Sequence, residues 1–316
     1  MFQVNLEKIG CGQKVSMREL HKVAELSGID PTADCQSQEI DGVEFLSSID
    51  RIGRFCEDTD IYCQLAVLHA AMDITVAGGD PKIASICIEY GPEFSSIEET
   101  AELTKSIQRA LSSLDMSAQN LHSVRSDYTH LTIAVTGTRR VIQTACQESG
   151  RVYISRKIGA SKLLVLNAME GEDIEDISNE IFGNRFLGSS VASVSAADIT
   201  GFGLAGAAYN LCLRLGVRAS LTLSAQHLFA NEVLSVPMPC FEALALPDAA
   251  TSAQCRRLEI VSKCIEFAGP ALMFVPEDSV SEFEMDFFAK HKQSPIQLGD
   301  FVQDRLKPGA DYIWES

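Results

Sequence analysis

Residues 197–206 read Ala-Asp-Ile-Thr-Gly-Phe-Gly-Leu-Ala-Gly, and this stretch places a carboxylate and glycines just before a predicted helix. An apolar stripe follows at helical spacing and stops at Gly216, a typical C-terminal signal. Backbone amides at such a helix start suit a phosphate group. The stretch is not a P-loop, because no Gly-Lys-Ser/Thr follows it. Asp198 also fits a plain helix cap, since Asp is favoured at that position.

Predicted strands and helices alternate along the rest of the chain. The predicted strands are 43–49, 83–90, 131–136, 162–167, 218–224, 271–275 and 296–302. Predicted helices begin near residues 16, 60, 96 and 203. Residues 139–159 are polar and irregular, so we place a domain boundary there and expect domains 1–155 and 156–316. The alternation predicts α/β or α+β layers.

Composition limits the class of partner. The chain has 316 residues, 46% hydrophobic and 22% charged, with a formal net charge of −17. This charge disfavours a broad grip on nucleic acid or on anionic lipid, so we expect no nucleic-acid and no membrane partner. None of the ten cysteines forms a C-x-x-C pair, and the first residues lack a signal-peptide core. We therefore expect a cytoplasmic protein with free thiols.

Four acidic residues stand where acids are awkward for packing. Asp34 lies in a polar stretch, Asp50 follows a predicted strand, Asp73 interrupts a helix, and Asp198 precedes the glycine-rich stretch. Carboxylates that converge on one cleft commonly hold Mg²⁺ on a nucleotide polyphosphate. Each acid alone also fits a capping or solvent-exposed role, so the prediction depends on the four acting together.

Gly10-Cys11-Gly12-Gln13-Lys14 sets a thiol between two glycines, with an ammonium three residues later. A neighbouring Lys favours the reactive thiolate form of a cysteine. Such a loop is able to deliver a nucleophile or a cation to a substrate. The alternative is an N-terminal segment whose thiol is incidental.

Two histidines are candidates for ligand contact. His69 precedes Asp73 by four residues, so both share one helical face. His122 follows a polar predicted helix end. A metal or phosphate contact fits either residue, and so does a core or surface position.

In this order, these motifs resemble the selenophosphate synthetase (selenide, water dikinase) family of the aminoimidazole ribonucleotide synthetase-like superfamily. The resemblance runs from about residue 9 to about residue 224. The stretches that carry it are 10–16, Asp50 with 73–81, 134–137 and 197–206. It implies a two-domain α/β (α+β) fold. In that fold the N-terminal mixed sheet pairs across a homodimer into a barrel, and the C-terminal domain is an α/β layer.

The resemblance also implies a reaction and roles for residues. ATP, selenide and water would give selenophosphate, AMP and phosphate. Asp34, Asp73 and Asp198 would be Mg²⁺ ligands, and Asp50, Asp73, Lys14 and His122 would contact the nucleotide. Lys14 would also neutralise developing phosphate charge, and Cys11 would handle selenide or a phosphoryl intermediate.

The chain departs from the family pattern at several places. His69 stands where the family has Asn, Arg125 stands where it has Asp, and Asn120-Leu121 stands where it has a glycine pair. Arg125 would invert a charge near the phosphates. Two alternatives therefore stay open beside selenophosphate synthesis. One is ATP-dependent phosphorylation of another small nucleophile, and the other is a non-catalytic nucleotide-binding paralogue.

Overall fold

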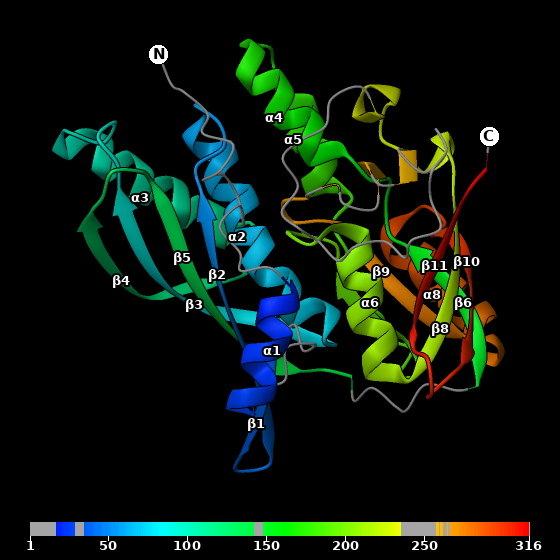
Figure 1. Ribbon diagram of the computed structural model, residues 1–316. Helices are drawn as coiled ribbons and strands as arrows, with labels where there is room; N and C mark the ends of the chain where they lie inside the picture. The colour runs from blue at the N-terminus through cyan, green and yellow to red at the C-terminus, as the bar shows by residue number, and fades with distance from the viewer. Residues whose placement is uncertain are drawn as a thin grey trace.

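The computed structural model describes residues 17–28, 35–141, 148–234, 257–258, 260–261, 264 and 266–315. Within them the chain forms two mixed β-sheets with helices packed on them (Figure 1). Strands and helices alternate along both halves, so the predicted α/β class is confirmed. No helix in this part of the chain combines the length and the apolarity needed to cross a bilayer.

The first sheet has five strands in the order β1-β2-β5-β3-β4. They are β1 (Gln36–Ile40), β2 (Val43–Gly53), β3 (Gly79–Tyr90), β4 (Ser117–Arg125) and β5 (His130–Arg139). β3 and β4 run parallel, and the other neighbouring pairs are antiparallel. Burial alternates along β3 and β5, as expected for strands with one face on a core.

Helices α2 (Thr59–Val76) and α3 (Ile97–Ser112) pack on this sheet. Helix α2 is apolar around most of its circumference because α3, the first sheet, β7 and α5 all contact it. Helix α3 starts with the predicted capping box, in which Ser96 and Glu99 satisfy each other's backbone amides. The opposite face of the sheet carries exposed side chains, among them Ile49 and Val124.

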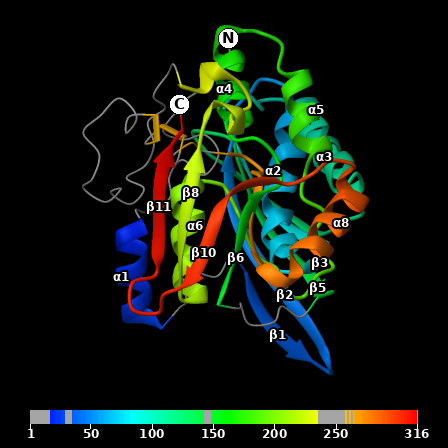
Figure 2. The same cartoon turned by 90° about the vertical axis from the view of Figure 1, so that its right-hand side faces the viewer.

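The second sheet has six strands in the order β11-β8-β10-β6-β9-β7. They are β6 (Ser149–Ile154), β7 (Ser195–Asp198), β8 (Val217–Leu223), β9 (Ala271–Pro276), β10 (Ile296–Gln303) and β11 (Gly309–Trp314). Only β11 and β8 run parallel among these pairs. Figure 2 looks onto this sheet, with α6 behind β8.

Five further α-helices and three short 3₁₀ helices complete the described structure, apart from residues 257–261, which are described only in part. The α-helices include α1 (Met17–Ser27), α4 (Ala160–Glu170), α5 (Glu175–Gly183), α6 (Gly203–Leu215) and α8 (Val280–His291). The 3₁₀ helices are η1 (Ala225–His227), η2 (Asn231–Leu234) and η3 (Glu277–Ser279). Helix α6 lies between the second sheet and the first half of the chain (Figures 1 and 2).

The strand predicted at residues 162–167 is wrong, because these residues belong to helix α4. The apolar run there is short, and periodicity alone does not separate a buried strand from a buried helix. Ala, Lys, Leu and Met favour a helix, and Gly159 and Gly171 bracket it in the left-handed conformation.

One apolar core joins the two halves of the chain, and a second lies inside the C-terminal half. Phe55 and Phe267 mark the junction, with stacked rings whose centroids are 4.3 Å apart. The chain leaves the first sheet at Arg139 and enters the second at Ser149, where β6 pairs with β9 and β10. The division into domains 1–155 and 156–316 stays a prediction.

Candidate active site

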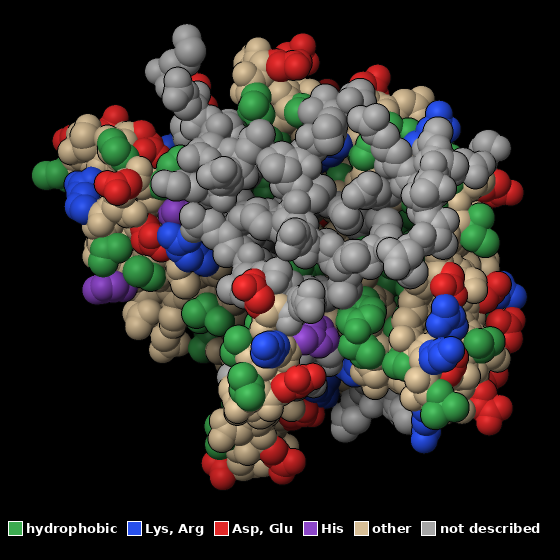
Figure 3. All heavy atoms as spheres, viewed as in Figure 1, with side chains coloured by type: hydrophobic (Ala, Val, Ile, Leu, Met, Phe, Trp, Pro, Cys, Tyr) green, Lys and Arg blue, Asp and Glu red, His purple; other side chains and the backbone are tan. Residues whose placement is uncertain are grey.

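Three of the predicted aspartates line one cavity of about 560 Å³ at the junction of the two halves. Asp50 comes from β2, Asp73 from the last part of α2, and Asp198 from the end of β7. These are three separate elements, so the convergence is a product of the tertiary fold. The space-filling view in Figure 3 shows the face of the molecule on which α1 lies. The roles of the three side chains as ligands stay a prediction.

Local structure holds each carboxylate in place. The Asp50 side chain is only 10% exposed and lies on the same face of β2 as Ser48. The Ser48 hydroxyl donates a hydrogen bond to Asp73 Oδ2, which ties the strand to the helix. Asp198 is 8% exposed and ends β7, while Phe202 is the N-cap of α6. The helix-cap alternative for Asp198 is therefore wrong.

The start of α6 forms another wall of the cavity. Gly203 and Gly206 line it, and Gly203 has a φ of 63°, a conformation that a side chain rarely adopts. A helix start carries a partial positive charge and unsatisfied backbone amides. This wall is therefore suited to an anion, while the three carboxylates of the same cavity are suited to cations.

Charge balance favours a cation in this cavity. Its described lining residues include three carboxylates and neither Lys nor Arg. In the described part of the chain, no group of three acidic, His or Cys side chains lies close enough to hold one ion. Mg²⁺ fits such a donor set, because it prefers oxygen ligands and commonly binds one or two carboxylates, several waters and substrate phosphates.

His69 lies behind the cavity and contacts both halves. It is 1% exposed. Its Nδ1 accepts a hydrogen bond from the Ala268 backbone amide at 3.2 Å, and its Nε2 is 3.6 Å from Asp50 Oδ1. The His69 ring therefore connects a cavity carboxylate to a segment 199 residues later in the sequence.

The remaining predicted residues lie elsewhere. Cys11, Lys14 and Asp34 lie outside the described residues. His122 is exposed on β4, beside Cys87 of β3, and does not line the cavity. Arg125 ends β4, donates to the Phe94 carbonyl and lies over the Tyr90 ring, so it also stands apart from the three aspartates.

Sequence reasoning missed several lining residues, including Ser48, Thr200 and Asn210. Asn210 is held by His21 of α1, whose Nε2 is 3.3 Å from Asn210 Oδ1. Leu20, the neighbour of His21, also lines the cavity. Polar side chains of this kind are common in surface positions, so no sequence signal distinguishes them.

Comparison with known proteins gives distant relatives. No protein-family model matches the chain. The selenide, water dikinase of Pasteurella multocida (strain Pm70) is 24% identical over 238 residues, which cover 67% of each chain. The selenide, water dikinase of Escherichia coli (strain K12) is 23% identical over 242 residues, which cover 68% of this chain and 69% of the enzyme.

Solved structures match over nearly the whole chain. The tt0281 protein from Thermus thermophilus has a TM-score of 0.66 at 17% identity and covers 94% of this chain and 97% of its own. AaThiL, solved with AMPPCP and TMP, has a TM-score of 0.61 at 15% identity, with 95% and 96% covered. A chain of a HypE–HypF complex has a TM-score of 0.63 at 15% identity, and the match covers 94% of this chain and 96% of that one. These likenesses show the aminoimidazole ribonucleotide synthetase-like fold.

Proposed function

We propose that this chain, a divergent relative of the selenide, water dikinases, transfers a phosphoryl group from Mg²⁺-bound ATP in the cavity shared by Asp50, Asp73 and Asp198. The observation that carries the proposal is the convergence of three carboxylates from three elements on one cavity of about 560 Å³. This volume is within the range of small-molecule sites. Two relatives of the same fold, AaThiL and HypE, were solved with AMPPCP and with ATP.

Phosphoryl transfer requires mainly positioning and charge neutralisation. Mg²⁺ would supply the positive charge that the phosphates and the carboxylates both need. Asp73 and Asp198 are the proposed ligands, and the Ser48 hydroxyl fixes the orientation of the Asp73 carboxylate. The start of α6, at Gly203, presents its backbone amides to the phosphate side.

Selenide is the proposed acceptor, with Cys11 and Lys14 as the residues that handle it. The support is the N-terminal motif together with the names of the curated relatives. Helix α1 also supports it, because Leu20 lines the cavity and Lys14 precedes Met17 by only three residues. Three residues span at most about 10 Å. Cys11 precedes Met17 by six residues, which span at most about 20 Å, so Cys11 and Lys14 are both within a short length of chain from the helix that lines the cavity.

We also propose that the chain forms a homodimer through the open face of the first sheet. On that sheet Ile49 is 68% exposed and Val124 is 42% exposed. An open sheet face with apolar side chains is typical of an interaction surface. The molar mass in solution, measured by light scattering, tests this part of the proposal.

Phosphorus NMR of protein, Mg²⁺, ATP and selenide, under anaerobic reducing conditions, tests the reaction. We expect selenophosphate and AMP from the wild type, and a loss of about 100-fold or more in Asp73→Asn. Asp127→Asn is the matched control, because Asp127 is exposed and outside the cavity. Cys11→Ala tests the thiol separately.

Each other outcome has a defined meaning. Intact ATP in a folded protein would favour the non-catalytic alternative. ADP or AMP without selenophosphate would retain the kinase-like chemistry and reject selenide as the acceptor. Equal turnover by Asp73→Asn and the wild type would contradict the proposal that this cavity is the active site.

A further inference from the structure

A short segment at the junction of the two halves, residues 266–270, contacts the first half beside the aspartate cavity. This segment, the junction turn, leads into β9. Its Ala268 amide donates to Nδ1 of His69 at 3.2 Å. His69 lies on α2, and its Nε2 atom is 3.6 Å from Oδ1 of Asp50. The junction turn therefore reaches one cavity carboxylate through a single buried ring.

The same turn is fixed to the strand that carries Asp198. The Pro270 carbonyl accepts from the Ile199 amide at 2.9 Å. One residue further, Ala271 pairs with Asp198 in the antiparallel register of β9 and β7. The cavity carboxylates of β2 and β7 belong to different sheets, so the junction turn connects them over a few consecutive residues.

Ala268 has a backbone conformation that is unusual for alanine. Its φ is 47°, in the left-handed region, where a Cβ atom is disfavoured. Three other described non-glycine residues have a positive φ, and all are exposed at turns or helix ends: Asp41, Asp115 and Lys292. Ala268, in contrast, is fully buried. A strained conformation that persists is held by its surroundings, and such conformations cluster at functional sites.

Contacts on both sides of the Ala268 Cα atom hold this conformation. The amide bonds to His69, and the carbonyl accepts from Nη2 of Arg156 at 3.0 Å. Arg156 is only 5% exposed, and Glu266, at the start of the turn, lies 3.6 Å from the same guanidinium nitrogen. A change of φ at Ala268 would turn its amide and its carbonyl relative to each other. The left-handed conformation therefore directs the amide at His69 while Arg156 holds the carbonyl.

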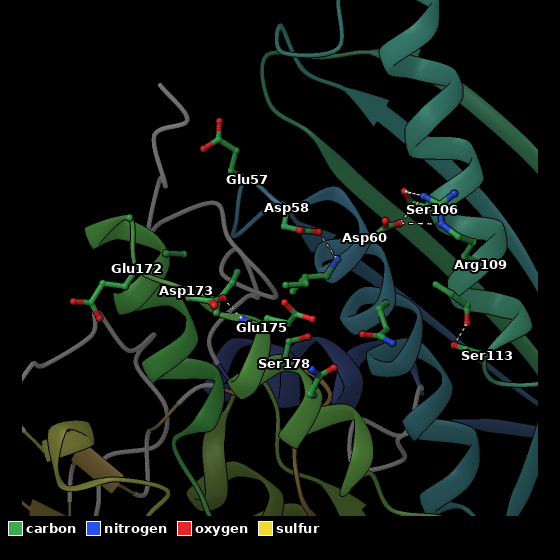
Figure 4. Close-up of a pocket in the computed structure, with 17 residues that line it drawn as sticks. Glu57, Asp58, Asp60, Ser106, Arg109, Ser113, Glu172, Asp173, Glu175 and Ser178 are labelled. Carbon is green, nitrogen blue, oxygen red and sulfur yellow. Dashed lines mark hydrogen bonds and ion pairs between the residues drawn. The ribbon is translucent and has the colours of Figure 1, made fainter.

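Helix α2 is held at its other end by contacts that do not involve the junction turn. Asp58 caps the helix by accepting from the Ile61 amide at 2.8 Å, and Asp60 pairs with Arg109 of α3 at 2.7 Å. Figure 4 shows these contacts at the start of α2, beside a cavity of about 690 Å³. Because α2 is anchored there, the contact of the turn with His69 fixes the second half of the chain against a helix that is itself held in place.

We propose that Ala268 is a positioning residue for phosphoryl transfer, and that its left-handed conformation holds Asp50 and Asp198 at the separation that Mg²⁺-bound ATP requires. This role rests on the proposed function and adds to it the residue that sets the two halves of the site relative to each other. Carboxylates from separate sheets need such a residue, because a displacement of about 1 Å is enough to cost about 100-fold in rate.

The variant Ala268→Gly tests the proposal. Glycine retains the amide and the carbonyl and adopts the left-handed conformation without strain, but it also reaches many other conformations. We expect a melting temperature close to that of wild type, because the relief of strain offsets the loss of one buried methyl group. We expect the affinity for Mn²⁺-ATP, measured by electron paramagnetic resonance with Mn²⁺ in place of Mg²⁺, to fall about tenfold and kcat about 100-fold.

Lys292→Gly is the matched control. Lys292 also has a positive φ, 58°, but it is exposed at the C-cap of α8 and does not line the aspartate cavity. This variant should equal wild type in Mn²⁺-ATP affinity and in turnover. Equal losses in Lys292→Gly and Ala268→Gly would overturn the proposal, and so would wild-type affinity in Ala268→Gly.

The double variant His69→Asn/Ala268→Gly separates positioning through His69 from a general loosening of the core. Substitutions that act through one set of contacts are not additive. We therefore expect the double variant to lose less Mn²⁺-ATP affinity than the product of the two single fold-changes. A loss equal to that product would overturn the proposal.

Failure of phosphoryl transfer is a distinguishable outcome. A wild type that binds Mn²⁺-ATP without turning it over would reject the proposed function, and the affinities of the three variants would still decide the role of Ala268. A wild type that binds no Mn²⁺-ATP would overturn both proposals, because Ala268 would then have no bound complex to position.

Discussion

The Nε2 atom of His69 lies 3.6 Å from Oδ1 of Asp50, while Nδ1 of the same ring accepts a hydrogen bond from the Ala268 amide. An Nδ1 that accepts is unprotonated, so the ring proton is on Nε2 and faces the carboxylate. The buried ring is therefore held by the Ala268 amide of the second half of the chain and directs its Nε2 atom at the Asp50 carboxylate. We infer that His69 is a positioning residue for the aspartate cavity.

Two substitutions of His69 distinguish the contribution of its Nδ1 atom from that of its Nε2 atom. His69→Asn retains an acceptor near the Nδ1 position for the Ala268 amide and loses the contact with Asp50, so we expect near-normal stability with a raised KM for Mg²⁺-ATP. His69→Leu leaves the Ala268 amide unsatisfied, and we expect a loss of about 1–3 kcal/mol in the free energy of unfolding. Urea unfolding and steady-state kinetics of both variants check this. Equal stability and equal KM values for the two variants would contradict these distinct roles of Nδ1 and Nε2.

Glu266 is a buried acid that organises the junction between β6 and α4. It is fully buried, accepts from the Gly159 amide and from Ser161 Oγ at 2.8 Å, and lies 3.6 Å from the Arg156 guanidinium. Removal of one partner from a buried ion pair leaves an uncompensated charge. We therefore expect Glu266→Leu to lower the free energy of unfolding by about 3–5 kcal/mol. Chemical denaturation checks this, and Glu282→Gln, at an exposed acid on α8, should stay within about 0.5 kcal/mol of wild type.

The elements that can be predicted from the sequence are those whose apolar residues recur at a regular helical or strand spacing. Helices α2 and α6 and strands β3 and β5 follow from apolar spacing, and they occur where it places them. Strands β1 and β4 are not predictable in this way, because every residue in both is exposed and no alternation marks them. Their pairing depends on neighbouring strands.

The acidic residues of the candidate site can be predicted from the sequence, but the residues that position them cannot. Asp50, Asp73 and Asp198 stand at conspicuous places in the sequence, and the structure brings them to one cavity. The contact of His69 with Ala268 joins residues 199 positions apart, which local patterns do not encode. The one available signal is a histidine inside the otherwise apolar run Leu65–Met72.

The stability of the protein should fall as the pH is lowered from about 6.5 towards 4. Burial, with the cations Lys290 and Arg185 adding to it and Asp286 opposing it, lowers the pKa of His291 to about 4. The unfolded chain, whose His pKa is near 6.5, then binds more protons than the folded chain in that window, so unfolding is favoured there.

We expect the free energy of unfolding to fall by about 1–2 kcal/mol over this pH range. This is less than the full shift in the pKa of His291 implies, because its ring is partly solvated. His291 stacks on Phe287, with ring centroids 4.0 Å apart. His291→Phe retains this stacking and removes the titration. We expect its melting temperature to fall less than that of wild type between pH 6.5 and 4.5, measured by calorimetry. If the melting temperatures of the two proteins fell equally with pH, His291 would be excluded as the source of the acid sensitivity.

Gly269 is a position where no side chain fits. A Cβ atom added there would overlap the Ile199 carbonyl oxygen and approach the Glu266 side chain to 2.9 Å. Ile199 directly follows Asp198, and Ala268 holds His69, so the overlap would disturb both sides of the aspartate cavity. We expect Gly269→Ala to lower the free energy of unfolding by about 1–3 kcal/mol, the usual cost of an overpacked core, and to reduce turnover further than that loss of folded protein explains.

Gly183 provides the matched control for this substitution. It ends helix α5, and a Cβ atom added there meets nothing within 4 Å. Gly183→Ala should therefore be neutral or stabilising by up to about 1 kcal/mol, because alanine restricts the unfolded chain. Thermal unfolding of both variants, with turnover measured per folded molecule, decides the matter. If Gly269→Ala matched Gly183→Ala in both readouts, the close approach of Gly269 to Ile199 would not constrain the cavity.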